Sequence, residues 1–177
     1  MSRAPGPTGW LRTRGMTEGP LERFVDGLDY PMYVVTTRAG EDRAGCLVGF
    51  ATQTSIDPAR FLVCISEANA TARTVAAATH VAVHAVERKH KQLARLFGEE
   101  SEDWTDKFAQ CAWHDGPHGV PLLDDAAAWF VGEIAERLDL GDHQGLLLMP
   151  VDGGGNASSG DVLTFQQLTD LDAGHPA

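Results

Sequence analysis

Short apolar runs separated by turn-forming residues dominate the middle of the chain. Met32 to Thr37 and Phe61 to Ile65 are rich in β-branched and aromatic residues, which is the composition of β-strands. Residues 39–42 follow the first run and Asp57-Pro58 precedes the second, and both contain residues that turns favour. The pattern predicts two strands, with a hairpin after the first of them.

Similar runs recur along the rest of the chain. They predict strands over residues 43–54, 80–86, 128–138, 144–151 and 162–165, helices over residues 70–78 and 87–97, and a loop over the Gly/Ser-rich residues 152–160. We expect Gly98 to end the second helix, and the Gly141-Asp142-His143 turn to join two of the strands. Because strands outnumber helices and the turns are short, the sequence predicts a mainly β fold with antiparallel pairing and a few helices.

The first 19 residues have a different character. Gly and Pro interrupt them and no apolar period is sustained, which predicts a flexible leader over residues 1–19 and one folded domain over residues 20–177. One domain also suits the length of 177 residues, since about 150 residues per domain is usual. The leader has no continuous apolar stretch of the kind that a signal peptide or a membrane-spanning helix needs.

The charge balance narrows the expected partners. Asp and Glu total 25 against 14 for Lys and Arg, the net charge is -11, and no Lys/Arg-rich run offers a path for phosphates. We therefore expect neither nucleic acid nor an anionic membrane as a partner. The three cysteines are an odd number, which favours unpaired thiols in a reducing compartment and predicts a cytoplasmic protein.

Polar groups gather where the strand ending at Ile65 gives way to a helix. Ser66, Asn69, Thr71 and Arg73 supply hydroxyl, amide and guanidinium groups there. A helix start presents backbone N–H groups that suit a phosphate, and Arg73 would add a bidentate clamp. The alternative is that Asn69 only caps the helix and Arg73 lies in solvent. Spacing alone leaves both interpretations open.

Small residues followed by polar ones mark the stretch from Gly45 to Ser55. Such a stretch offers a wall against which a planar ring can lie, with backbone N–H and C=O groups for the ring edge. The alternative is a central barrel strand with glycine at its bends.

His143 is the histidine that we single out as a catalytic candidate. The Gly141-Asp142-His143 turn can hold its imidazole at the mouth of a site, with Asp142 beside it to orient or charge the ring. The alternative is a turn histidine that satisfies only the local backbone.

Other candidate chemistry is weaker. Cys111, His114 and His118 have ligand-like spacing, but a structural zinc site takes four ligands, and we expect no metal. Cys64 lies in an apolar strand, where cysteine behaves as a small hydrophobic residue. The chain has no Gly-x-Ser-x-Gly, P-loop or Gly-x-Gly-x-x-Gly motif. The tryptophans are expected to be core or dimer-contact anchors: Trp104, Trp113 and Trp129.

Taken in order, these segments resemble the flavin-reductase-like family, whose members form an FMN-binding split β-barrel and pair as homodimers. The resemblance runs from about Phe24 to the C-terminus. It rests on the following motifs: Tyr33-Val34-Val35-Thr36-Thr37, Gly45 through Pro58, Phe61-Leu62-Val63-Cys64-Ile65-Ser66, Asn69-x-Thr71-x-Arg73, residues 81–86, residues 93–98, Asp106-Lys107-Phe108, Pro121-Leu122-Leu123 and Gly141-Asp142-His143.

The resemblance implies a role for each candidate segment. It places the flavin ring and ribityl chain along Leu47, Val48, Gly49, Phe50, Thr52 and Gln53, and the phosphate at Ser66, Asn69, Thr71 and Arg73. It places His143 near the flavin and the nicotinamide. The chain departs from the family at Leu47 and Gly49, where many members have Thr and Ser, and at His84, which replaces a common Asn.

These observations lead to one main hypothesis and two alternatives. The main hypothesis is a cytoplasmic, homodimeric oxidoreductase: an FMN-binding flavoprotein that transfers hydride from NADH or NADPH to flavin and supplies reduced flavin to a partner monooxygenase. One alternative is a non-catalytic FMN-binding or flavin-storage protein. The other is a split-barrel dimerisation module without cofactor.

Overall fold

The computed structural model describes residues 19–99, 105–158 and 160–171. Residues 1–18 of the leader expected over residues 1–19, and the segment containing Trp104, lie outside the described residues. The strands are β1 (Tyr33–Ala39), β2 (Asp42–Val48), β3 (Ala51–Ile56), β4 (Ala59–Ser66), β5 (His80–Ala85), β6 (Trp113–Asp115), β7 (Pro121–Leu123), β8 (Ala128–Asp139) and β9 (His143–Gly155). The helices are α1 (Pro20–Val25), α2 (Thr71–Ala77) and α3 (Lys91–Glu99), with 3-10 turns at Arg88–His90, Lys107–Gln110, Pro117–Gly119 and Phe165–Gln167.

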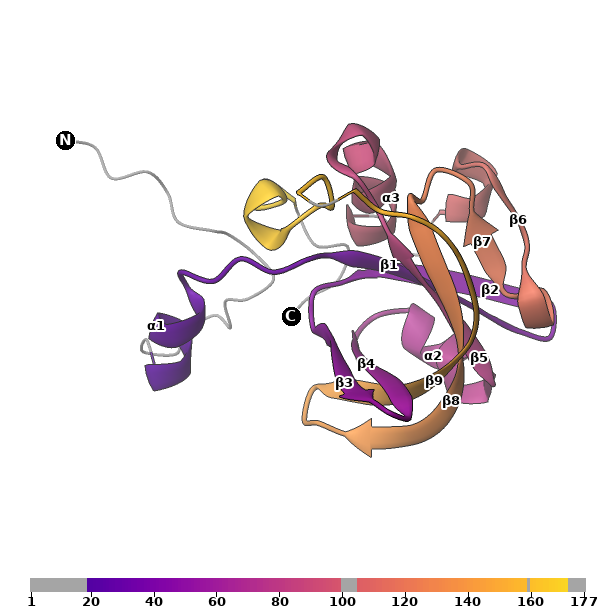
Figure 1. Ribbon diagram of the computed structural model, residues 1–177, viewed down its shortest axis with the longest axis horizontal. Coiled ribbons are helices and arrows are strands. Elements are labelled where there is room, and N and C mark those ends of the chain that lie inside the picture. The colour runs from indigo at the N-terminus through magenta and orange to yellow at the C-terminus, as the bar shows by residue number, and fades with distance from the viewer. Residues whose placement is uncertain (1–18, 100–104, 159, 172–177) are drawn as a thin grey trace.

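One seven-stranded antiparallel sheet forms the body of the protein. Its strand order is β2-β1-β5-β8-β9-β4-β3, and a separate two-stranded sheet joins β6 to β7. Figure 1 shows the large sheet curling round α2, so that β3 and β4 face β1 and β2 across the interior. The expected mainly β, antiparallel split barrel is confirmed.

The inside of the curl is the first hydrophobic core. Alternate residues of the strands point inwards, as the period of two in a strand requires, and Val75 of α2 packs among them. The buried members are Val35, Cys46, Val48, Val63, Ile65, Val75, Val81, Val83, Leu146 and Leu148. Since Val63 and Ile65 point inwards, their neighbours Leu62, Cys64 and Ser66 point to the outer face of β4.

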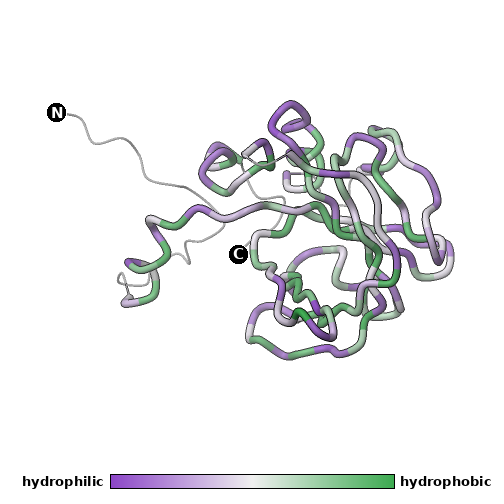
Figure 2. The backbone as a smooth tube through the Cα atoms, viewed as in Figure 1, coloured by the Kyte–Doolittle hydropathy of each residue, from purple (hydrophilic) through white to green (hydrophobic). Residues whose placement is uncertain are grey.

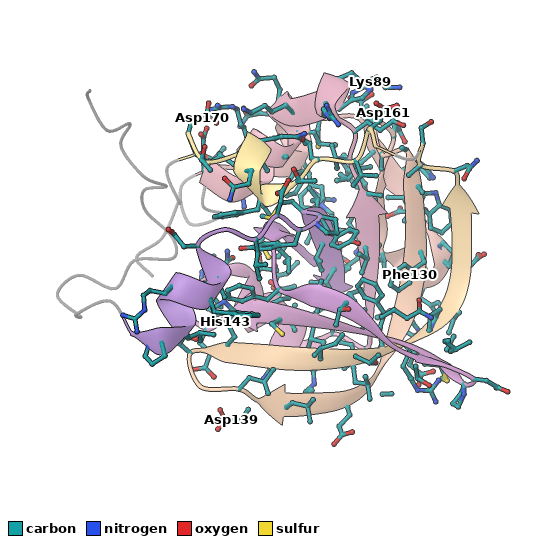
Figure 3. The ribbon with its side chains drawn as sticks, turned by 60° about the vertical axis from the view of Figure 1, so that its left-hand side comes forward. Lys89, Phe130, Asp139, His143, Asp161 and Asp170 are labelled. Atoms are coloured by element: carbon teal, nitrogen blue, oxygen red, sulfur yellow. The ribbon has the colours of Figure 1, made fainter. Side chains whose placement is uncertain are left out.

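A second core lies on the other side of β1 and β2, under α3 and the C-terminal segment. Leu93, Ala94 and Phe97 of α3 face it, together with Leu163, Phe165 and Leu168. The buried ammonium of Lys107 donates a hydrogen bond to the Gly45 carbonyl beneath this layer, at 2.9 Å. Figure 3 shows Asp170 at the surface beside this layer, where its carboxylate pairs with Lys91 at 3.0 Å and also with Arg95.

The α1 helix lies apart from the sheet in Figure 1. Figure 2 shows that it nevertheless carries apolar positions, and the side chains of Leu21 and Phe24 are 67% and 71% exposed. A six-residue helix is marginal alone and normally needs packing to persist. This helix therefore presents an apolar surface that the rest of the described chain does not cover.

Four sequence expectations need correction. The strand expected over residues 43–54 is broken at Gly49 and Phe50 into β2 and β3. Residues 152–155 belong to β9 rather than to a loop, because they pair with β8. Residues 162–165 form only isolated bridges and a 3-10 turn, and Gly98 lies inside α3 instead of ending it. A Cβ at Gly98 would lie 3.0 Å from the Leu47 side chain, so this glycine permits close packing on β2.

Candidate functional site

The β8–β9 turn places His143 beside the end of β4. His143 is the direct partner of Ser66 in the β4–β9 register, and the backbone N–H of Glu67 donates to the Asp142 carbonyl at 3.0 Å. Figure 3 shows His143 at the end of the β8–β9 hairpin. Two segments that are far apart in the sequence, the loop after β4 and the Gly-Asp-His turn, therefore lie side by side.

Phe50 brings a third segment to the same place. Its ring centroid lies 5.2 Å from that of the His143 imidazole, tilted by 53°, and its carbonyl accepts the backbone N–H of Cys64 at 2.8 Å. The Phe50 side chain is 44% exposed, so it forms part of the surface beside the histidine. The structure thus brings Phe50, Ser66 and His143 together.

An apolar surface continues from this group over the outer face of β4, β8 and β9. Leu62 and Cys64 point outwards, on the same face as Ser66 and His143. A Cβ at Gly145 would lie within 3.3 Å of Leu62, Leu138 and Leu140, so these side chains meet over the bare backbone of that glycine. We call Phe50, Leu62, Cys64, Leu138 and Leu140 the outer patch. Sequence reasoning missed all but Phe50, although the outward period of Leu62, Cys64 and Ser66 was a visible signal.

Other parts of the protein cover the side-chain positions of Leu47, Val48 and Gly49. Leu47 packs against the second core, and Val48 is buried inside the barrel. A Cβ at Gly49 would lie 3.0 Å from both Tyr30 and Met32. These three residues can therefore offer a flavin mainly their backbone groups, whereas the side chains of Thr52 and Gln53 are exposed on β3.

The loop after β4 uses several of its polar groups locally. The Asn69 side-chain oxygen accepts the N–H of Thr71 at 3.0 Å, and the Ser66 hydroxyl accepts the N–H of Ala68 at 3.3 Å. Asn69 lies one residue before the N-cap position, which is Ala70 and makes no side-chain capping bond, so the cap expected at Asn69 is not formed. Thr71 is fully buried, so its side chain does not face solvent.

Arg73 is exposed and lies at a surface depression between α2 and the β1–β2 hairpin. The depression has a volume of about 590 Å³, which is within the range of ligand sites. It is lined by Ala39, Gly40, Asp42, Arg43, Ala44, Ala70, Arg73, Thr74 and Ala77. Arg43 and Arg73 contribute two guanidinium groups to this lining and Asp42 one carboxylate, whereas Ser66, Asn69 and Thr71 do not line the depression.

Acid–base chemistry at the site centres on the turn itself. The His143 Nδ1–H donates to the Asp142 carboxylate at 2.7 Å, and this hydrogen bond lowers the pKa of Asp142 from its usual value. Burial raises the pKa of the Cys64 thiol, which keeps it in the neutral, unreactive form. The outer patch therefore offers an apolar wall beside an imidazole, with no charged nucleophile in it.

The side chains of Cys111, His114 and His118 do not converge on a common point. His118 stacks on His80 with the ring centroids 3.8 Å apart, while His114 bonds Asp124 at 2.6 Å. Burial and nearby aspartates raise the pKa of Cys111 to about 11. Within the described residues, no group of three or more His, Cys, Asp or Glu side chains is arranged to hold a metal ion.

Among the residues that the structure describes, no helix is both long enough and apolar enough to cross a membrane.

Comparison with known proteins matches residues 25–169 to the model of the flavin reductase like domain. The stachydrine N-demethylase reductase subunit Stc3 of Rhizobium meliloti is 33% identical over 113 residues, covering 62% of this chain and 48% of that protein. The FMN reductase (NADH) RutF of Bradyrhizobium diazoefficiens is 32% identical over 110 residues, covering 62% and 61%. The chain spans 35% to 48% of the length of the first three curated relatives that it matches.

Among solved structures, an FMN-binding protein from Thermus thermophilus with bound 1-cyclohex-2-enone superposes with a TM-score of 0.77. The sequences are 26% identical, and the match covers 94% of this chain and 97% of that one. The likeness therefore extends over nearly the whole chain.

Proposed function

Because the chain belongs to the flavin reductase like family, we propose that it is an FMN-binding reductase that transfers hydride from NADH or NADPH to flavin. The observation that carries this proposal is the convergence of Phe50, Ser66 and His143 from three separate segments. An apolar wall with exposed hydroxyl and amide groups beside it is what the ring and ribityl chain of a flavin mononucleotide require of a site. The residues present fit that group.

The chain's own residues have distinct tasks in this proposal. The backbone of Leu47, Val48 and Gly49 and the side chains of Phe50, Thr52 and Gln53 bind the ring and the ribityl chain. Ser66, Asn69 and Arg73 bind the phosphate, while Thr71 is buried at the start of α2 and supports the loop that carries them. FMN, when bound, supplies the hydride-accepting ring, because hydride transfer is the cofactor's chemistry.

His143 positions the nicotinamide in this proposal. Its imidazole borders the outer patch and has one nitrogen turned to Asp142. Holding the nicotinamide in a reactive orientation accelerates transfer without a protein nucleophile or a proton transfer. The outer patch excludes water from the same face.

We also propose that the protein acts as a cytoplasmic homodimer and supplies reduced flavin to a partner monooxygenase. The exposed apolar side chains of Leu21, Phe24 and Leu140 support the homodimer, because a second copy would cover them. The likeness to the reductase subunit of a demethylase supports the role as a reductase component.

A non-catalytic FMN-binding protein is the second candidate. The fit to the Thermus thermophilus FMN-binding protein over 94% of the chain favours it. An FMN-dependent oxidation assay separates the two candidates. We expect purified protein to oxidise NADH or NADPH only when FMN is present, whereas a carrier would bind FMN and leave the nicotinamide unchanged. Protein that binds no flavin at all would instead favour a cofactor-free dimerisation module.

A further inference from the structure

The Gly-Asp-His turn is held by several backbone bonds before any ligand arrives. Leu140 N–H donates to the His143 carbonyl at 3.0 Å, and Gly141 N–H donates to the Asp139 carboxylate at 3.1 Å. Gly141 has a φ of 97°, a conformation that residues other than glycine rarely adopt. The bond from Glu67 N–H to the Asp142 carbonyl ties the turn to the loop after β4. Asp142 is thus fixed in space although its side chain is exposed.

The imidazole of His143 is bounded on two sides. Asp142 accepts from Nδ1–H at 2.7 Å, and the Phe50 ring lies 5.2 Å away, centroid to centroid. Across the parts of the chain that the structure describes, Nε2 has no hydrogen-bond partner, while 23% of the side chain stays exposed. A contact that occupies Nδ1 determines which nitrogen carries the proton, since in a neutral imidazole one nitrogen donates and the other accepts.

From this geometry we propose that Asp142 is a positioning residue that holds His143 as the Nδ1–H tautomer and presents the Nε2 lone pair to the carboxamide N–H of the nicotinamide. The inference rests on the proposed function, because it needs a nicotinamide at the site. Asp142 does not touch the reacting atoms. The Asp142 carboxylate is largely exposed, so its hydrogen bond to the neutral imidazole adds little to stability, and we assign the contact to orienting the ring.

The ligand-free protein gives the first test. Nitrogen-15 NMR of the His143 ring distinguishes protonation at Nδ1 from protonation at Nε2. We expect Nδ1–H in the wild type, and a shift towards Nε2–H in Asp142→Ala, which removes the acceptor. Asp142→Glu should restore the wild-type tautomer. Asp139→Ala is the matched control, because it removes a bond of the same turn without touching the imidazole, and it should leave the tautomer unchanged.

Steady-state kinetics gives the second test. Loss of one orienting hydrogen bond should raise KM for NADH or NADPH about fivefold in Asp142→Ala, the factor expected for roughly 1 kcal/mol, while FMN affinity stays the same. Asp142→Glu should recover most of the loss, and Asp139→Ala should behave as wild type. An equal KM rise in Asp139→Ala would show that turn geometry alone matters and would overturn the inference.

Failure of the inference differs from failure of the proposed function. If the wild type oxidises nicotinamide but Asp142→Ala keeps both the wild-type tautomer and the wild-type KM, the role of Asp142 is wrong and the reductase stands. If the wild type binds FMN and oxidises no nicotinamide, the proposed function falls, and with it the carboxamide contact. The NMR result still decides in that case whether Asp142 sets the tautomer.

Discussion

His84 makes the stability of this fold depend on pH in a way that one substitution should remove. The imidazole is fully buried on β5, where Nδ1–H donates to the Val34 carbonyl at 3.0 Å and Nε2 accepts the Leu123 N–H at 3.2 Å. The neutral ring thus satisfies both neighbours and links β1 to β7 through β5. Protonation at Nε2 would place an N–H opposite the Leu123 N–H, so that two hydrogen-bond donors would face each other without an acceptor.

Burial lowers the pKa of His84 to about 4, well below the usual 6.5, despite the favourable bond to Val34. The unfolded chain takes up a proton near pH 6.5 and the folded chain only near pH 4. Stability from this group is therefore complete above about pH 6.5 and is lost as the pH falls towards 4. Between 6.5 and about 4, at about 1.4 kcal/mol per pKa unit, the loss of stability is at most about 3.5 kcal/mol.

His84→Asn tests this reasoning. Asparagine can still donate to the Val34 carbonyl but leaves the Leu123 N–H without its acceptor, which costs about 1–3 kcal/mol near pH 7. Because asparagine does not titrate, urea unfolding followed by tryptophan fluorescence should show that this deficit shrinks as the pH approaches about 4. His114→Asn, at an exposed position, is the control and should retain the wild-type acid sensitivity. A deficit for His84→Asn that is constant with pH would refute the argument.

Three further predictions concern the ligand site and the assembly. Arg73→Ala should weaken FMN binding by about tenfold or more through loss of a charge-assisted hydrogen bond, while riboflavin affinity scarcely changes in parallel titrations; an equal loss for both flavins would remove the phosphate assignment. Size-exclusion chromatography with light scattering should show a homodimer, whose interface would bury about 1,600 Å² if standard in size, and a monomer at micromolar protein would contradict it. His143→Ala should raise KM for NADH or NADPH with FMN affinity nearly intact, and wild-type kinetics in this variant would make His143 a structural turn residue.

The strands could be predicted where side-chain pattern and pairing agree. The Met32 to Thr37 and Phe61 to Ile65 runs became β1 and β4, because their apolar residues face the cores and their turns are short. Residues 152–155 were missed because glycine propensity favours a loop. Pairing with β8 overrides that propensity, and the Trp129 ring covers Gly154 at 3.0 Å from where its Cβ would be.

Near the C-terminal end of the described chain, the apolar pattern alone led to a wrong strand prediction over residues 162–165. Leu163 and Phe165 are 1% and 4% exposed, so their hydrophobicity reflects burial in the second core. The strand expected there never forms, since Val162 and Thr164 make only isolated bridges, to Glu87 and Pro31. A residue can be buried without pairing in a sheet, and a short apolar run in the sequence does not distinguish a buried turn from a buried strand.

The candidate residues could be chosen from the sequence, but their arrangement could not. Phe50 and His143 are far apart in the chain and meet only because Ser66 pairs with His143 in the β4–β9 register. Registers between distant strands depend on the whole sheet. The sequence also could not show that Leu47 and Val48 can offer a ligand only their backbone groups. This follows from the structure, because hydrophobic cores cover both sides of β2.

Reduction of protein-bound flavin in a single turnover tests the central claim most directly. Protein loaded with FMN is mixed anaerobically with NADH, and in parallel with NADPH, in a stopped-flow spectrometer. The account predicts loss of the oxidised-flavin absorbance with at least one nicotinamide, at a rate that saturates with its concentration and that is slower or saturates later in His143→Ala. Flavin that stays oxidised with both nicotinamides, while remaining bound to the protein, would contradict the claim.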